Sequence, residues 1–437
     1  MYQSALHISV SLVFLSYLVA RPPASPKSSP TDARPFAHFQ ANYLLVYLLA
    51  VAADWLQGPY IYALYAQYGF SKSDIGRLYI AGFASSAVFG TVVAALADRY
   101  GRRNNALLYC VLYAASCLTK HSPNYYVLLF GRILGGVAYS ILSSAFESWM
   151  VYEHTARAFH PALLASTFAR AQFWNGVVAM VAGQVSGWLA LRYGKVMPFD
   201  LSVCVLALLF GLVAATWTEN YGDERQSVRG GFARAWSSLL GDEKILLLGV
   251  SQSAFEGALY TFTFMWTPAL QTAAGQVGEI PHGTVFSSFM AATMIGSNVF
   301  AYASRCVRVE TLMRSVFLTG GVLFLAAALS RRIEVVYGSF LLFELLCGVY
   351  FPGMATMRAP YVPEESRSAL LTFFRVPLNV IVVLALYQDM SVGRVFFVCA
   401  GLMGVAVASQ QRLMRLVARK RAAGEDELLE MEKASQT

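Results

Sequence analysis

Two arginines occupy matched places in long apolar stretches of the chain. A Thr-Phe-x-Arg segment ends at Arg170 and is followed by Asn175, and a second ends at Arg375 and is followed by Asn379. A guanidinium is always protonated and presents a planar fork of donors that suits a tetrahedral oxyanion. Two such groups facing one cavity would repel each other until a dianion came between them. We therefore expect an oxyanion site between these segments, to which one or both asparagines add neutral hydrogen bonds.

Four further ionisable residues also lie in apolar stretches: Asp54, Arg132, Glu256 and Glu344. A charge in hydrocarbon costs at least about 2.5 kcal/mol, so it normally faces a bundle interior, pairs, or serves a transport path. Together with the two arginines these residues could form three buried ion pairs, which is the structural alternative to a transport site. The Gly-rich sequence after Arg132 favours helix packing. The carboxylates are either counter-ions of the arginines or proton carriers, and the sequence leaves both roles open.

The elements that must position these charges are helices that span a membrane. The 437 residues are 57% hydrophobic and 13% charged, whereas an average soluble domain is about a quarter charged. A bilayer core of about 30 Å needs about 20 apolar residues. We expect twelve spans, which start near Tyr43, Gly76, Asn105, Tyr125, Ser166, Val196, Lys244, Thr284, Thr311, Val335, Ala369 and Val395.

The longest polar connection, residues 218–243, divides the spans six and six. We expect bundles over 41–217 and 244–417, with a charged tail over 418–437. Residues 1–40 contain an apolar run at 5–20 and a Pro/Ser-rich linker. That run lacks a basic leading segment, which favours a retained extra helix over a cleaved signal peptide.

Basic residues collect in alternate connections, in the central connection and in the tail, which predicts that the last two are cytoplasmic. The net charge of +8 therefore indicates orientation in a membrane rather than binding to nucleic acid. A plasma membrane is the first expectation, with an internal membrane as the alternative. The six cysteines mostly occur singly in apolar runs, so we expect free thiols.

Comparison of each span with the one six places later supports two related halves. Besides the arginine pair, Arg132 falls opposite Glu344, and Asp54 and Glu256 each stand six residues before an aromatic residue. Parallel repeats of six helices are typical of one large class of transporters. The predicted fold is all-α, with two pseudo-symmetric six-helix bundles and an extra N-terminal helix.

A charged loop between the second and third spans has the composition of a switch. An acid ends one helix, and arginines after a glycine turn could pair with acids in one state and release them in another. The corresponding loop of the second half lacks the acid, so we expect asymmetric gating. The loop resembles the cytoplasmic signature of the major facilitator superfamily, and its candidate gating residues are Asp98, Arg99, Gly101, Arg102 and Arg103.

A narrower resemblance extends from Phe39 onward and is to the molybdate-anion transporter family of that superfamily. The similar strings are ADWLQGPY at 53–60, GRILGG at 131–136, SAFE at 144–147, TFARAQFWN at 167–175, FSSFMAA at 286–292 and FRVP at 374–377. The resemblance implies uptake of molybdate, a tetrahedral dianion, by alternating access. It carries over no site residue, so the site prediction depends on the charges and the repeat.

Two alternatives to a molybdate carrier remain open from the sequence. The chain could carry another oxyanion or a small organic acid, or it could be a transporter-like receptor or scaffold that signals through its tail. We do not expect an enzyme, because the chain contains no HExxH motif and no convincing nucleophile constellation. We also expect no cofactor, no metal and no ATP site. The predicted partners are the oxyanion, the lipid bilayer and, if transport is coupled, protons.

Overall fold

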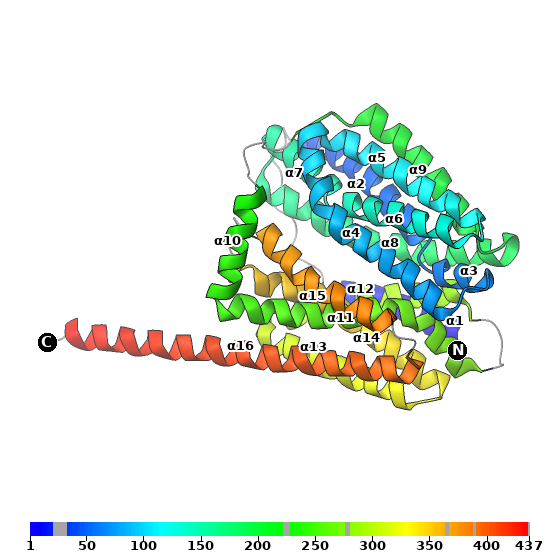
Figure 1. The fold of residues 1–437 in the computed structure, drawn as a ribbon. Coiled ribbons are helices and arrows are strands. Elements are labelled where there is room, and N and C mark those ends of the chain that lie inside the picture. The colour runs from blue at the N-terminus through cyan, green and yellow to red at the C-terminus, as the bar shows by residue number, and fades with distance from the viewer. Residues whose placement is uncertain (21–32, 222–227, 276–279, 363–366, 388–389, 436–437) are drawn as a thin grey trace.

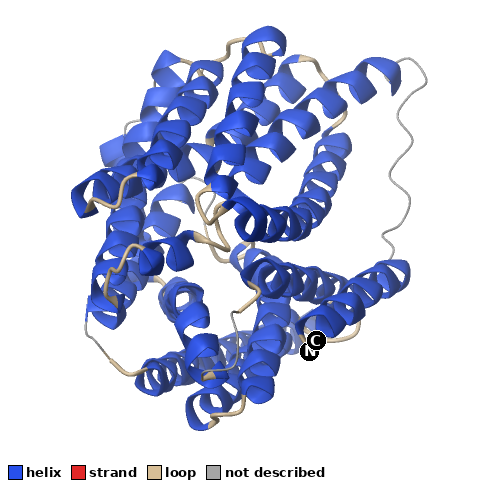
Figure 2. Ribbon diagram, turned by 90° about the vertical axis from the view of Figure 1, so that its right-hand side faces the viewer, coloured by secondary structure: helices blue, strands red, loops and turns tan. Residues whose placement is uncertain are grey.

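The computed structural model describes residues 1–20, 33–221, 228–275, 280–362, 367–387 and 390–435. Within these ranges every regular element is a helix, as Figure 2 shows from the side that carries α3 and the N-terminus. Eight of the described helical segments are long and apolar enough to cross a membrane. Helices also occupy the other four places where spans were expected, near Gly76, Asn105, Ser166 and Ala369.

The first half follows the extra helix α1 (Tyr2–Ala20). Its helices are α2 (Ala33–Trp55), α3 (Ile61–Gln67), α4 (Lys72–Tyr100), α5 (Arg102–Leu118), the 3-10 turn η1 (Thr119–His121), α6 (Tyr125–Leu142), α7 (Ala145–Ala156), α8 (Pro161–Tyr193) and α9 (Met197–Thr216).

The second half follows the connecting helix α10 (Val228–Gly241). Its helices are α11 (Glu243–Ala274), α12 (His282–Ala303), α13 (Val309–Leu329), α14 (Ile333–Arg358), α15 (Arg367–Tyr387) and α16 (Val392–Ser435). Figure 1 shows α10 and the end of α16 at one end of the molecule and α3 at the other. We call these the α10 end and the α3 end.

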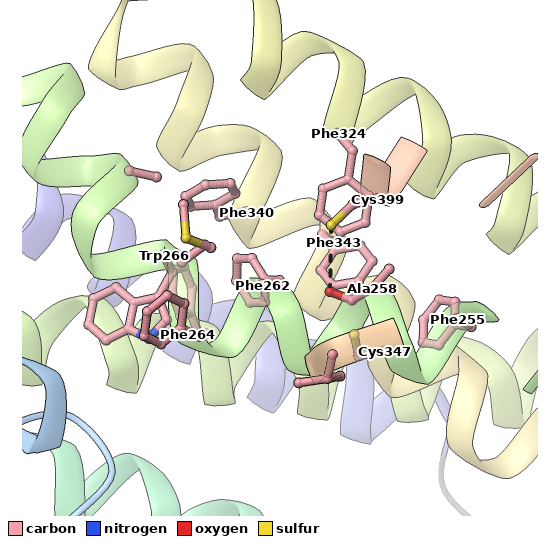
Figure 3. Packing of buried hydrophobic residues seen from close by; sticks show 14 of the residues in the cluster. Phe255, Ala258, Phe262, Phe264, Trp266, Phe324, Phe340, Phe343, Cys347 and Cys399 are labelled. Carbon is pink, nitrogen blue, oxygen red and sulfur yellow. Dashed lines mark hydrogen bonds between the residues drawn. The ribbon is translucent and has the colours of Figure 1, made fainter. Parts of the chain in front are cut away.

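The core of the second half is largely aromatic. The Phe262 ring on α11 lies 5.0 Å from the Phe340 ring and 5.2 Å from the Phe343 ring, and Phe343 lies 4.4 Å from Phe324 (Figure 3). Large rings combine extensive contact area with few rotatable bonds. They therefore hold α11, α13 and α14 in a fixed relation. All six cysteines are free, and four of them are buried.

Matched helix pairs in the two halves approach each other through glycine. A Cβ added at Gly136 on α6 would collide with the carbonyl of Gly82 on α4, and one added at Gly348 on α14 would collide with the carbonyl of Thr293 on α12. Small residues permit such close backbone approach in membranes, where van der Waals packing drives helix association. The repeat inferred from sequence is therefore present in the packing.

Helix α1 packs against the second half although the first half follows it in the chain. Asn298 of α12 donates to Ser16 with N···O 2.9 Å, and Val13 lies in a cluster with Ala291 and Met294. The contact between α1 and α12 is among the most extensive in the molecule. The extra helix expected from residues 5–20 is thus a packed element of the fold.

The described hydrogen bonds between the halves lie toward the α3 end. Lys72 of α4 donates to the carbonyl of Met390, and Gln184 of α8 donates to Ser287 of α12 at 2.9 Å. A Cβ on Gly283 would collide with the carbonyl of Gly183, so α8 and α12 cross backbone to backbone. The α3 end is therefore where the two halves are joined most firmly.

Candidate substrate site between the two halves

Arg170 is exposed on α8 but its guanidinium already has a partner. Its Nη1 donates to Oε1 of Gln40 at 2.7 Å, and Nε2 of Gln40 donates to Oγ1 of Thr167 at 2.7 Å. Gln40 lies on α2 and is buried. The threonine and arginine of the first Thr-Phe-x-Arg segment are thus bound into one network inside the first half.

Arg375 is exposed on α15 and differs from Arg170 in its surroundings. No hydrogen bond of its guanidinium is found in the part of the chain that the structure describes. Its charge acts on Glu256 and Tyr260 of α11 and on Tyr139 of α6. Because Tyr139 belongs to the first half, Arg375 lies close to the space between the halves.

The second half surrounds Glu256 with polar groups that the sequence did not single out. Tyr350 donates to Oε1 of Glu256 at 3.1 Å, and the Gln252 side chain interacts with the Glu256 carboxylate. Arg358 donates to Oε1 of Gln252 at 2.8 Å. Because α14 continues to Arg358, the side chain of this residue belongs to the network.

Asp54 and Arg132 lie in the first half without a direct ion pair. Tyr113 donates to Oδ1 of Asp54. Arg132 on α6 donates through Nε to the carbonyl of Leu78 on α4 at 3.1 Å, and its guanidinium lies 4.8 Å from the centre of the Tyr79 ring. Arg132 therefore ties α6 to α4, which agrees with a role in helix packing.

Glu344 occupies the matched place in the second half. It is buried on α14, and Thr293 of α12 donates to its Oε2 at 3.0 Å. Like Arg132, it bridges the two helices that approach through glycine. Within the described part of the chain, none of the six intramembrane charges comes within ion-pair distance of another. Three direct buried ion pairs, the structural alternative, are therefore not what the structure contains.

The two asparagines differ in the same way as the arginines. Nε1 of Trp55 donates to Oδ1 of Asn175 at 2.8 Å, so the oxygen of Asn175 has a partner inside the first half. Asn379 is half-buried on α15, one helical turn after Arg375. Asn379 is thus the asparagine that follows Arg375, whose guanidinium has no hydrogen bond within the described residues.

The charged loop between α4 and α5 binds to its own half. Arg103 donates to the carbonyl of Ala214 at 2.8 Å, and Arg102 donates to the carbonyl of Ser148 at 3.2 Å. Glu219 accepts from the backbone amide of Arg103 at 2.8 Å. The side chains of Asp98 and Arg99 lie outside the described residues.

Glu219 completes this loop and was missed by the sequence reading. Gly101 has φ +101°, and a Cβ there would collide with the Glu219 carboxylate. A carboxylate at a helix N-terminus satisfies free backbone amides and interacts well with the helix dipole. The glycine of the signature is therefore required both for its φ and for the space that Glu219 fills.

Comparison with known proteins places the chain in a family. A family model described as sugar transporters with twelve membrane spans matches residues 11–339. The molybdate-anion transporter of Takifugu rubripes is 37% identical over 426 residues, which cover 88% of this chain and 87% of the relative. The molybdate-anion transporter of Xenopus laevis is 37% identical over 421 residues, which cover 91% and 90%.

Solved structures agree on the fold. The nucleoside transporter NupG matches with a TM-score of 0.69 at 10% identity over 86% of this chain and 98% of that one. The human organic anion transporter MFSD10 (TETRAN) matches with a TM-score of 0.60 at 15% identity over 86% and 99%. The all-α, two-bundle architecture predicted from the sequence is confirmed, and the protein is a multi-pass integral membrane protein. The chain belongs to the molybdate-anion transporter family of the major facilitator superfamily.

Proposed function

We propose that this protein is a secondary carrier that moves molybdate across a membrane by alternating access. The observation that carries the proposal is the environment of Arg375, a permanently charged donor group without a described hydrogen bond, near residues of both halves. An anion is the ligand that such a group binds best. The names of the relatives supply molybdate as the anion.

In this proposal the site consists of Arg375 with Asn379 on α15, and Arg170 with Asn175 on α8 serves the path toward it. Glu256, which interacts electrostatically with Arg375, is its proposed counter-ion. Asp54, Glu256 and Glu344 are the candidates for proton coupling, and Arg132 supports the helices of the first half. The molecule acts as a carrier and not as an enzyme.

The proposed domains are the two bundles at 41–217 and 244–417, joined by 218–243. Because the described hydrogen bonds between the halves gather at the α3 end, the state seen here would admit substrate from the α10 end. The basic connections at the α10 end support a cytoplasmic location for that end and for the tail at 418–437. The plasma membrane is the proposed location.

Uptake of molybdate by proteoliposomes that contain the purified protein tests this function. Sulfate and a neutral sugar serve as competitors. The sugar is included because the matching family model is described as sugar transporters. We expect molybdate uptake that sulfate inhibits and the sugar does not. Absence of uptake by correctly inserted protein would refute the carrier, and uptake of the sugar alone would refute the anion. A repeat with the proton gradient collapsed tests coupling.

A further inference from the structure

Two tyrosines from opposite halves lie near Arg375. Tyr139 on α6 is 45% exposed, and Tyr260 on α11 is half-buried. Each interacts electrostatically with the other, with Arg375 and with Glu256. Tyr139 also interacts with Asp54. These two phenols therefore interact with charged groups of both halves.

Their hydroxyls differ from those of the neighbouring tyrosines. Tyr113 donates to Asp54, and Tyr350 donates to Glu256, so both of these hydroxyls have carboxylate partners. For Tyr139 and Tyr260, no hydrogen bond of the hydroxyl is found within the described residues. Since neither side chain is fully buried, each O–H can donate to a bound ligand.

The ring of Tyr260 is held in place by an aromatic ladder between α4 and α11. The ring of Tyr260 lies 5.1 Å from the ring of Phe83. One helical turn away, the ring of Phe264 on α11 lies 5.2 Å from the ring of Tyr79 on α4. Residues four apart share a helix face, so the two pairs stack along the seam. These ring contacts hold the ring of Tyr260 in place, whereas its hydroxyl has no hydrogen bond within the described residues.

The three groups together provide what a tetrahedral oxyanion needs. Arg375 supplies positive charge and several N–H donors, and each phenol supplies one O–H donor. Hydrogen bonds to an ionised acceptor are about twice as strong as neutral ones. The donors come from α6, α11 and α15, so they can reach different oxygens of one anion.

We propose that Tyr139 and Tyr260 bind the transported oxyanion together with Arg375. This site rests on the proposed function for its role in transport. In it the first half contributes a neutral tyrosine, and the matched arginine of that half remains bound to Gln40. An anion held by Tyr139 on one side and Arg375 on the other links the two halves directly, so that binding favours their approach.

Removal of the two hydroxyls tests the site. Tyr139→Phe and Tyr260→Phe keep both rings and therefore the packing. Tyr302→Phe on exposed α12 surface is the matched control. We expect the KM for molybdate uptake to rise about 10- to 100-fold in each single variant, as the loss of one hydrogen bond to a charged group predicts. The control should retain the wild-type KM.

Thermal stabilisation of the detergent-purified protein by molybdate, sulfate or phosphate separates this site from the carrier function. We expect the wild type and Tyr302→Phe to be stabilised, and the double variant Tyr139→Phe/Tyr260→Phe to lose that shift at the same concentration. Equal shifts in the wild type and the double variant, or no shift with any oxyanion, would overturn the site. Binding without uptake by the wild type would instead overturn the carrier function.

Discussion

Arg170 and Arg375 end the same four-residue motif on corresponding helices of the two halves, yet their surroundings differ. Arg170 donates to Gln40, which is linked in turn to Thr167, whereas Arg375 has no hydrogen bond within the described residues and lies near tyrosines of both halves. The repeat therefore preserves the position of the arginine without preserving its hydrogen-bond partners. The arginine of the first half is bound within its own bundle, whereas the arginine of the second half interacts with residues of both halves.

The largest expected effect is from Arg375→Ala. In the proposed site the guanidinium of Arg375 contacts the anion, so its loss removes at least one charge-assisted hydrogen bond as well as the charge. We expect kcat/KM for molybdate uptake to fall by about 100-fold or more. Arg331→Ala, on an exposed connection of the same half, is the control for insertion and general charge. Wild-type uptake by the Arg375→Ala variant would show that Arg375 does not bind the anion.

Matched glycines should behave alike, unlike the matched arginines. Gly136→Ala and Gly348→Ala each force a methyl group against a neighbouring backbone carbonyl, which typically costs about 1–3 kcal/mol of unfolding free energy. Gly211→Ala on α9 has open space around it and should not lower the Tm, because alanine favours helix. Thermal unfolding in detergent measures all three. If only one of the two matched variants loses stability, the packing is not repeated as described.

Arg170→Ala should have a smaller effect on uptake than Arg375→Ala. Because Arg170 is bound to Gln40, its loss removes a contact between α8 and α2 and not the main anion contact, and we expect at most about a tenfold fall in kcat/KM. Gln40→Ala should have a similar effect. The double variant should cost less than the sum of the two, by about 1 kcal/mol. If Arg170→Ala lowered kcat/KM as much as Arg375→Ala does, both arginines would contribute equally to the site, as the sequence alone predicts.

The last expected effect concerns basic residues that differ between the two halves at the α3 end. Lys120 in η1 is buried, whereas Arg331 and Arg332 in the corresponding connection are exposed. Burial and the nearby charge of Arg132 lower the pKa of Lys120 to about 7. Between pH 7 and about 10.4, the usual lysine pKa, the unfolded chain therefore binds one more proton than the folded protein. Stability should rise with pH across this window, by at most about 1.4 kcal/mol per pH unit.

Thermal unfolding in detergent between pH 7 and 10 checks this slope. Lys120→Met should flatten the pH dependence because it removes the titrating group and keeps a similar length of apolar chain. Arg331→Ala should leave the slope unchanged. An identical slope in the wild type and Lys120→Met would show that Lys120 does not titrate in this range.

The sequence was sufficient for the helices, for the repeat and for the set of charges that had to be explained. Arg132 and Glu344 were expected to be matched, and they do occupy equivalent helix seams. The hydrogen bond between Arg170 and Gln40 was not predictable, because Gln40 lies 130 residues away in the sequence and an amide in an apolar stretch gives no strong signal. The sequence contains 24 tyrosines. Nothing in the local sequence distinguishes a tyrosine between the two halves, as proposed for Tyr139 and Tyr260, from one that faces lipid.

A relative rotation of α8 and α12 would turn about their crossing, where a Cβ on Gly283 would collide with the carbonyl of Gly183. The side chains of Ser287 and Phe286 lie beside this contact. Arg170 lies thirteen residues from Gly183 along α8, about 20 Å at 1.5 Å per residue. A tilt of about 10° at the crossing would therefore carry the Arg170 end of the helix sideways by about 3.5 Å, so a small rotation at the crossing becomes a larger displacement toward the α10 end.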